Sequence, residues 1–136
     1  MRLPALDEAV RGAEGRPQPA PSSAGRVLLV EDGDLVRALV REVLERGGFS
    51  VLEAAGPAEA LELARSDDPI DLLVTDLVLP GMSGTALVER ITAERPGLRF
   101  LYTSGYVDET LRGAGHVLEK SFTPEDLLLK VHDLLR

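Results

Sequence analysis

From Arg26 onward, short apolar runs alternate with segments whose apolar residues recur at the helical period. The apolar runs are predicted to be strands, at 26–32, 49–54, 70–76, 98–104 and 116–120. Helices are predicted at 34–46, 57–66, 84–95 and, as a short one, 107–113, with a last helix starting at 123–124. Strands that alternate with helices favour a parallel sheet covered on both faces, so the predicted fold class is α/β.

The first 25 residues differ from this pattern. Residues 12–25 read GAEGRPQPAPSSAG, a composition that cannot bury a useful apolar face. We therefore expect a flexible Pro/Ala-rich leader or linker at 1–25 and one folded domain at 26–136.

Charge and composition exclude several classes of protein. The chain has 15 Lys and Arg against 23 Asp and Glu, a formal net charge of −8. An acidic surface repels phosphates, so no nucleic-acid partner is expected. The chain has no cysteine, which excludes thiolate metal sites and fits a cytoplasmic location. No apolar run approaches the roughly 18 residues of a membrane helix, so no membrane contact by this domain is expected.

Chemically active residues stand where the predicted strands end. Glu31 and Asp32 end the first strand, Asp76 the third, Ser104 the fourth and Lys120 the fifth. In open parallel sheets the carboxyl ends of the strands form the ligand-binding edge. Clustered carboxylates favour a hard cation such as Mg²⁺, and a carboxylate can itself accept a phosphoryl group. The lysine and the hydroxyl are suited to stabilise charge on that group.

Four segments carry a family resemblance: LLVED (28–32), VTDLVLPGMSG (74–84), TSG (103–105) and EKSFTPEDLL (119–128). In order and spacing they resemble the response-regulator receiver domains of two-component signalling. The resemblance implies a flavodoxin-like, doubly wound, three-layer fold with a five-stranded sheet in the order 2-1-3-4-5.

The resemblance also implies roles for the strand-end residues. Asp76 resembles the phosphoacceptor, Ser104 the switch hydroxyl and Lys120 the phosphoryl-binding lysine. Glu31 and Asp32 resemble the acidic pair that holds Mg²⁺, together with Asp76 and the backbone carbonyl of Val78. The implied function is Mg²⁺-dependent phosphoryl transfer from a phosphohistidine to Asp76, without enzymatic turnover. The implied partner is a histidine kinase or a histidine phosphotransfer domain.

Three other functions stay open on the sequence. A haloacid-dehalogenase-type phosphatase also uses a strand-end Asp, but it pairs that residue with a second Asp where this chain has Val78. A nucleotide or flavin binder would need a glycine-rich phosphate loop, and neither GxGxxG nor a Walker loop is present. A degenerate receiver would act as a protein-binding module without phosphorylation.

The molecular setting also stays open. The leader MRLPALDEAV, followed by the linker, resembles the end of a histidine-kinase ATPase region, as found before the C-terminal receiver of a hybrid histidine kinase. A stand-alone regulator is the alternative.

Two departures from the family pattern carry expectations. Receivers commonly have a cis Lys-Pro bond where this chain has Lys120-Ser121. A cis bond without proline costs about 2.5–4 kcal/mol, so we predict a trans bond. Many receivers also carry an aromatic side chain three residues before the lysine, where this chain has Val117. We therefore expect a weakened output switch.

Overall fold

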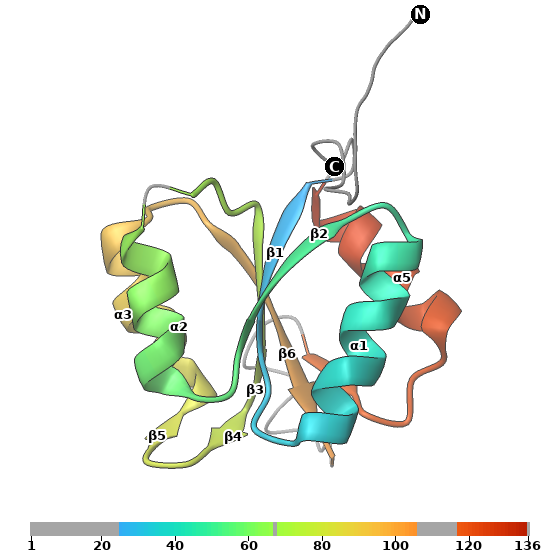
Figure 1. The fold of residues 1–136 in the computed structure, drawn as a ribbon, viewed down its shortest axis with the longest axis horizontal. Helices are drawn as coiled ribbons and strands as arrows, with labels where there is room; N and C mark the ends of the chain where they lie inside the picture. The colour runs from blue at the N-terminus through green and yellow to red at the C-terminus, as the bar shows by residue number, and fades with distance from the viewer. Residues whose placement is uncertain (1–24, 67, 106–116, 136) are drawn as a thin grey trace, which may run out of the picture.

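The computed structural model describes residues 25–66, 68–105 and 117–135. Within these ranges a parallel five-stranded sheet forms the middle of the domain (Figure 1). Its strands are β1 (Arg26–Val30), β2 (Ser50–Ala54), β3 (Leu72–Asp76), β6 (Arg99–Ser104) and β7 (Val117–Glu119). Their spatial order is β2-β1-β3-β6-β7, which confirms the predicted order 2-1-3-4-5.

Helices cover both faces of the sheet, which confirms the predicted flavodoxin-like α/β architecture. Figure 1 shows α1 (Asp34–Arg46) and α5 (Pro124–Leu135) on one face, and α2 (Pro57–Arg65) and α3 (Gly84–Glu94) on the other. Alternate residues of β1 feed the two cores: Leu28 and Val30 pack on the α2/α3 side, and Val27 and Leu29 pack on the α1/α5 side. After Arg26, every residue of β1 is apolar, because both faces of the strand are buried there.

Local sequence features explain where the helices begin and end. Pro57 stands at the start of α2, where its missing N–H costs nothing. At the start of α5, the Thr123 hydroxyl accepts from the amide of Asp126, and the Asp126 carboxylate accepts from the amide of Thr123. This reciprocal cap satisfies amides that would otherwise lack a partner. Helix α1 gives way to Gly47 and to Gly48, whose φ of +95° favours glycine.

The structure refines the predicted elements in two places. Between the predicted strand at 70–76 and the predicted helix at 84–95, it contains a small hairpin of β4 (Val78–Leu79) and β5 (Met82–Ser83). The apolar stripe of α1 is divided: Val40 and Leu44 are buried, whereas Leu35 and Leu39 are exposed. The peptide between Lys120 and Ser121 is trans, as predicted.

Two predictions fall on other parts of the chain. The short helix at 107–113 lies outside the described residues. So does nearly all of the 1–25 leader, and the proposed division of the chain at residue 25 stays a prediction. Among the helices in the described ranges, none is long and apolar enough to cross a membrane.

Candidate functional site

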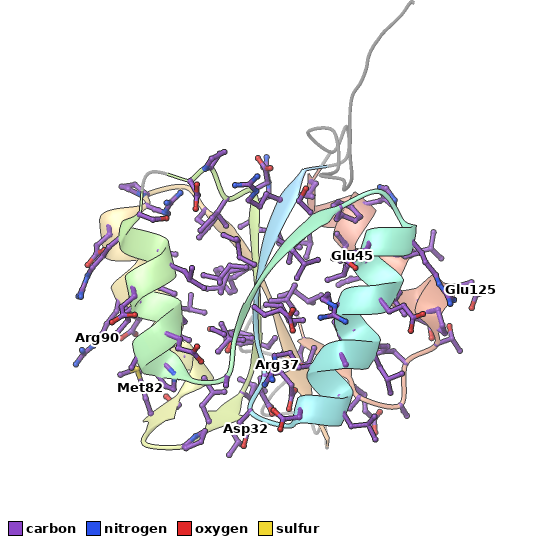
Figure 2. The ribbon with its side chains drawn as sticks, in the orientation of Figure 1. Asp32, Arg37, Glu45, Met82, Arg90 and Glu125 are labelled. Carbon is purple, nitrogen blue, oxygen red and sulfur yellow. The ribbon has the colours of Figure 1, made fainter. Side chains whose placement is uncertain are left out.

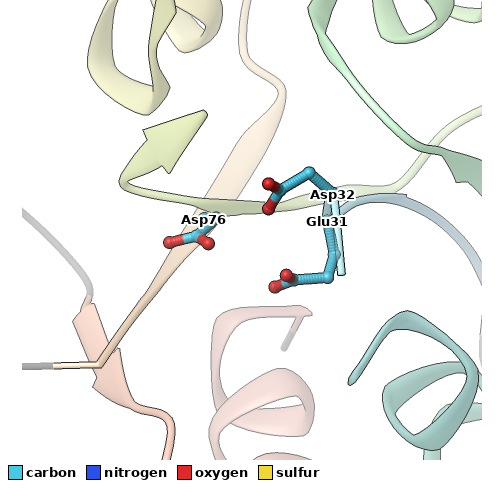
Figure 3. Close-up of side chains that lie close together, drawn as sticks. All are labelled: Glu31, Asp32 and Asp76. Atoms are coloured by element: carbon cyan, nitrogen blue, oxygen red, sulfur yellow. The ribbon is translucent and has the colours of Figure 1, made fainter. Parts of the chain in front are cut away.

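Three carboxylates gather at the edge of the sheet where β1 and β3 end. Glu31 and Asp32 follow the last residue of β1, and Asp76 is the last residue of β3, which pairs with β1. Each offers an oxygen that lies within 4.8 Å of the others (Figure 3). The cluster predicted from the strand ends is therefore present in the fold.

The three acids differ in burial and in anchoring. Glu31 and Asp76 are 4% and 6% exposed, while Asp32 is exposed. The Glu31 carboxylate accepts from the amide of Gly33 at 3.0 Å, and Asp76 Oδ1 accepts from the amide of Val78 at 3.3 Å. A buried carboxylate needs such partners because it has lost its hydration. Two of the acids are thus held by the protein, and the third faces solvent.

Lys120 forms ion pairs with both buried acids. It follows β7, and its Nζ lies 2.7 Å from Asp76 Oδ2 and 3.1 Å from Glu31 Oε1. Burial of the ammonium by itself lowers the pKa of Lys120, but the hydrogen bonds and charges of Asp76 and Glu31 outweigh it and raise that pKa above its ordinary value. Lys120 therefore stays positively charged at neutral pH and bridges the ends of β1 and β3.

Ser104 lies between β3, which carries Asp76, and β7, which leads to Lys120. It ends β6, in which the preceding Thr103 pairs with Asp76 and Ser104 itself pairs with Glu119 of β7. The amide of Lys120 donates to the Ser104 carbonyl at 2.6 Å. Ser104 is 7% exposed, so it forms part of the floor of the site. Its role as a switch hydroxyl stays a prediction.

Val78 belongs to the turn that follows β3. Its side chain is 76% exposed, and its amide donates to Asp76. The structure thus brings Val78 to the site together with the five strand-end residues. The predicted use of its carbonyl as a metal ligand stays a prediction.

Gly84 packs against the end of β3 in a way that the sequence analysis missed. A Cβ atom at position 84 would overlap the carbonyl oxygen of Asp76 and come within 3.0 Å of Leu77 Cα. The amide of Gly84 also donates to the Leu77 carbonyl at 2.8 Å. Only glycine therefore allows α3 to start this close to the end of β3. The glycine that closes PGMSG is the signal that points to this approach.

Arg37 is a second residue that the sequence analysis missed. It lies in α1, and its Nη1 donates to the backbone carbonyl of Glu31 at 2.9 Å. Figure 2 shows Arg37 near Asp32, at the end of the molecule where α1 begins. Its spacing from Asp34 indicates a pair on one helix face, but the contact with residue 31 depends on the fold.

An apolar groove of about 290 Å³ opens beside Lys120. Val36, Leu39 and Val43 of α1 line one side, and Phe122 and Pro124 line the other. Leu35 and Leu39 are 74% and 54% exposed on the same helix. The acidic edge is thus flanked by an apolar surface that belongs largely to α1.

The donor set fits a magnesium ion. Mg²⁺ prefers carboxylate oxygens and water at about 2.1 Å in octahedral geometry, which places neighbouring ligand oxygens about 3 Å apart. Oxygens that already lie within 4.8 Å of one another need only a small rearrangement to meet this spacing. Three carboxylates and one ammonium leave a formal charge of −2, which one divalent cation balances.

Comparison with known proteins agrees with this geometry. Residues 27–132 match the family model described as the response regulator receiver domain. A crystal structure of a CheY-like receiver domain protein from Methanospirillum hungatei JF-1 superposes with a TM-score of 0.73 at 30% identity, covering 82% of this chain and 93% of that one. The chain belongs to the response regulator receiver domain family.

Similar curated proteins have different overall sizes. The sensor kinase CckA of Brucella abortus (strain 2308) is 34% identical over 80% of this chain, which spans 12% of that protein. The response regulator receiver protein CpdR of the same organism is 31% identical over 81% of this chain, which spans 96% of that protein. The chain covers only 12% to 56% of the length of three larger relatives.

Proposed function

We propose that this chain is the phospho-accepting receiver of a two-component phosphorelay and that Asp76 accepts the phosphoryl group. The observation that carries the proposal is the setting of Asp76. Its carboxylate lies at a strand end, is almost fully buried, and contacts Lys120 Nζ at 2.7 Å. Glu31 and Asp32 stand beside it as candidate ligands for a cation. A nucleophile, a metal site and a fixed positive charge are the parts that phosphoryl transfer requires.

In the proposed reaction, an oxygen of Asp76 attacks the phosphorus of a phosphohistidine. A P–O bond forms at Asp76, the P–N bond breaks, and the electron pair of that bond stays on the imidazole nitrogen. Lys120 and the Ser104 hydroxyl are proposed to stabilise charge on the transferred group. We expect one transfer per phosphorylation event rather than turnover of a free substrate.

The proposed metal ligands are Asp32, Asp76 and the carbonyl of Val78, with Glu31 completing the acidic cluster. When bound, Mg²⁺ supplies positive charge that offsets the charge on the phosphoryl oxygens. The exposure of Asp32 and Val78 leaves that side of the cluster open to water and to the incoming phosphoryl group.

The proposed donor is a histidine kinase or a histidine phosphotransfer domain that presents its histidine on a helical bundle. The apolar groove and the exposed Leu35 and Leu39 of α1 lie beside the acidic site. An apolar helical surface docked there would bring a histidine near Asp76. The absence of cysteine is compatible with a reducing compartment, so we further propose a cytoplasmic location.

The direct test is labelling with acetyl phosphate in the presence of Mg²⁺. The wild-type chain should take up one acid-labile phosphate, and Asp76→Asn should take up none because an amide is a poor nucleophile. Asp133→Asn, on the exposed side of α5, is the matched control and should label like the wild type. A label that persists in Asp76→Asn would refute the assignment. A wild-type chain that cannot be labelled would instead support a degenerate receiver that only binds a partner.

A further inference from the structure

The guanidinium group of Arg37 ties together the start of α1, the loop before it and the end of β2. Nη1 donates to the Glu31 carbonyl at 2.9 Å, and Nη2 donates to Asp34 Oδ1 at 2.7 Å. Nε lies 3.4 Å from Glu53 Oε1, and the side chain is only 18% exposed. Arg37 thus has three protein partners, and the partner of Nη1 is the backbone of Glu31, in the loop between β1 and α1.

This backbone leads into Asp32, whose side chain has the fewest contacts among the three acids. The Glu31 carbonyl belongs to the peptide that leads directly into Asp32. Within the described residues, the Asp32 carboxylate has no hydrogen bond or ion pair, whereas Glu31 and Asp76 are each anchored by an amide and by Lys120. The position of the Asp32 carboxylate therefore depends on how firmly its backbone is held.

The charge of Arg37 has little effect on a nearby cation. Asp34 and Glu53 each carry a negative charge within ion-pair distance of the guanidinium. The hydrogen bond to Asp34, supported by the charges of Asp34 and Glu53, outweighs the opposing effect of burial and raises the pKa of Arg37 above its ordinary value, so the group stays ionised. Because its charge is already balanced, its main effect on the acidic cluster is through geometry rather than repulsion.

We propose that Arg37 is a positioning residue for divalent-cation binding, which holds the Glu31–Asp32 peptide so that the Asp32 carboxylate faces the cluster. The inference rests on the proposed magnesium site. Residues that orient metal ligands in this indirect way typically change metal affinity by about 10–100-fold when they are replaced.

Arg41 provides a matched control. It stands one helical turn further along α1, and its Nη1 lies 2.9 Å from Glu53 Oε2. Arg41 therefore carries the same charge as Arg37 and also contacts Glu53. Its other side-chain partner is Glu45, where Arg37 instead contacts the Glu31 carbonyl and Asp34. A difference between variants at positions 37 and 41 therefore reports on the contacts that only Arg37 makes, with the Glu31 carbonyl and with Asp34.

The experiment is calorimetric titration of Mg²⁺ into the full chain. Arg37→Gln should weaken Mg²⁺ binding about tenfold, while Arg41→Gln should stay near the wild-type affinity. Arg37→Lys keeps the charge but loses the planar fork, so it should also weaken binding. Tighter binding by Arg37→Gln would mean that charge repulsion dominates and would overturn the inference. Equal binding by the wild type and both Arg37 variants would overturn it as well.

Two further measurements separate positioning from general destabilisation and from failure of the site itself. Without Mg²⁺, the free energy of unfolding should fall more for Arg37→Gln than for Arg41→Gln, because Arg37→Gln also loses the bonds to the Glu31 carbonyl and to Asp34, but both variants should stay folded under the conditions of the titration. Labelling by acetyl phosphate should be slow in Arg37→Gln at low Mg²⁺ and recover at saturating Mg²⁺; a deficit that persists at saturation would contradict a role limited to cation binding. A wild-type chain that binds no Mg²⁺ would remove the proposed site and this inference together, whereas wild-type binding with unaffected Arg37 variants removes the inference alone.

Discussion

The buried carboxylates of Glu31 and Asp76 share the ammonium group of Lys120. Two like charges at one sheet edge repel each other, and burial strengthens that repulsion because water no longer screens it. The contacts of 3.1 Å and 2.7 Å to Lys120 Nζ offset it. The lysine thus stabilises the folded protein whether or not a phosphoryl group is present. This contribution to the free energy of unfolding depends on pH.

Because the pKa of Lys120 is raised in the folded protein, the folded state binds the lysine proton more tightly than the unfolded chain does. The stabilisation is fully present below the unfolded pKa of about 10.4 and is lost as the pH rises through the folded value. In EDTA, the gap in unfolding free energy between wild type and Lys120→Met should therefore be constant from pH 8 to about pH 10 and shrink above it.

Chemical denaturation at a series of pH values measures this gap. Lys130→Met, which removes the same charge from α5 at a distance from the acidic cluster, separates the general effect of charge from the contacts of Lys120. A gap that widens at alkaline pH would show that Lys120 does not stabilise the folded state through its charge.

At the level of secondary structure, the sequence predicted the features that depend on residues close together in the chain. Strand and helix positions followed from apolar periodicity, and the starts of α2 and α5 followed from Pro57 and the Thr123 cap. The carboxyl-edge rule was enough to gather Glu31, Asp32 and Asp76 at one site. The roles of Arg37 and Gly84 were not predicted, because each depends on residues that only the fold brings near. The β4–β5 hairpin is too short to leave a periodic signal.

In the proposed mechanism, helix α1 serves the site in two ways, through Arg37 on its packed side and through apolar residues on its outer side. Leu39 lines the groove beside Lys120 and is 54% exposed. Leu39→Ser should reduce phosphoryl transfer from a phosphorylated histidine domain about tenfold, the scale of an interface residue worth about 1.4 kcal/mol. Labelling by acetyl phosphate should be unchanged, because that small donor needs no docking surface.

Leu129→Ser is the control, since Leu129 is 70% exposed on α5, outside the groove. Both substitutions are at exposed positions and should change stability by no more than about 0.5 kcal/mol. Equal transfer rates for the two variants would place the docking surface elsewhere. Parallel loss of transfer and of acetyl phosphate labelling in Leu39→Ser would point to a damaged site instead.

Across the whole molecule, the sheet connects the acidic site to a core that has little room to rearrange. The strands that carry the site contribute completely buried residues to the core, among them Leu28, Leu73 and Leu101. On the edge strand β7, Val117 pairs with Tyr102 and packs against the core on the α2/α3 side. Val117 has no aromatic ring that could swing inward. A switch based on such a ring is therefore not available at this position.

We therefore expect the response to phosphorylation to be local. With Mg²⁺ and beryllofluoride as a phosphoryl mimic, amide chemical shifts should change most near Asp76, Ser104 and Lys120 and in the loop of Asp32, and little along α5. Asp76→Asn with the same additions controls for direct effects of the ions.

The physical reason for a local response is that a tightly packed core transmits a change only when a second packing is available, and valine at position 117 offers none through its side chain. Large shifts along α5, or dimerisation that appears only with beryllofluoride, would show that this chain drives a global switch. Shifts confined to the site would instead fit a domain that mainly passes or drains phosphoryl groups.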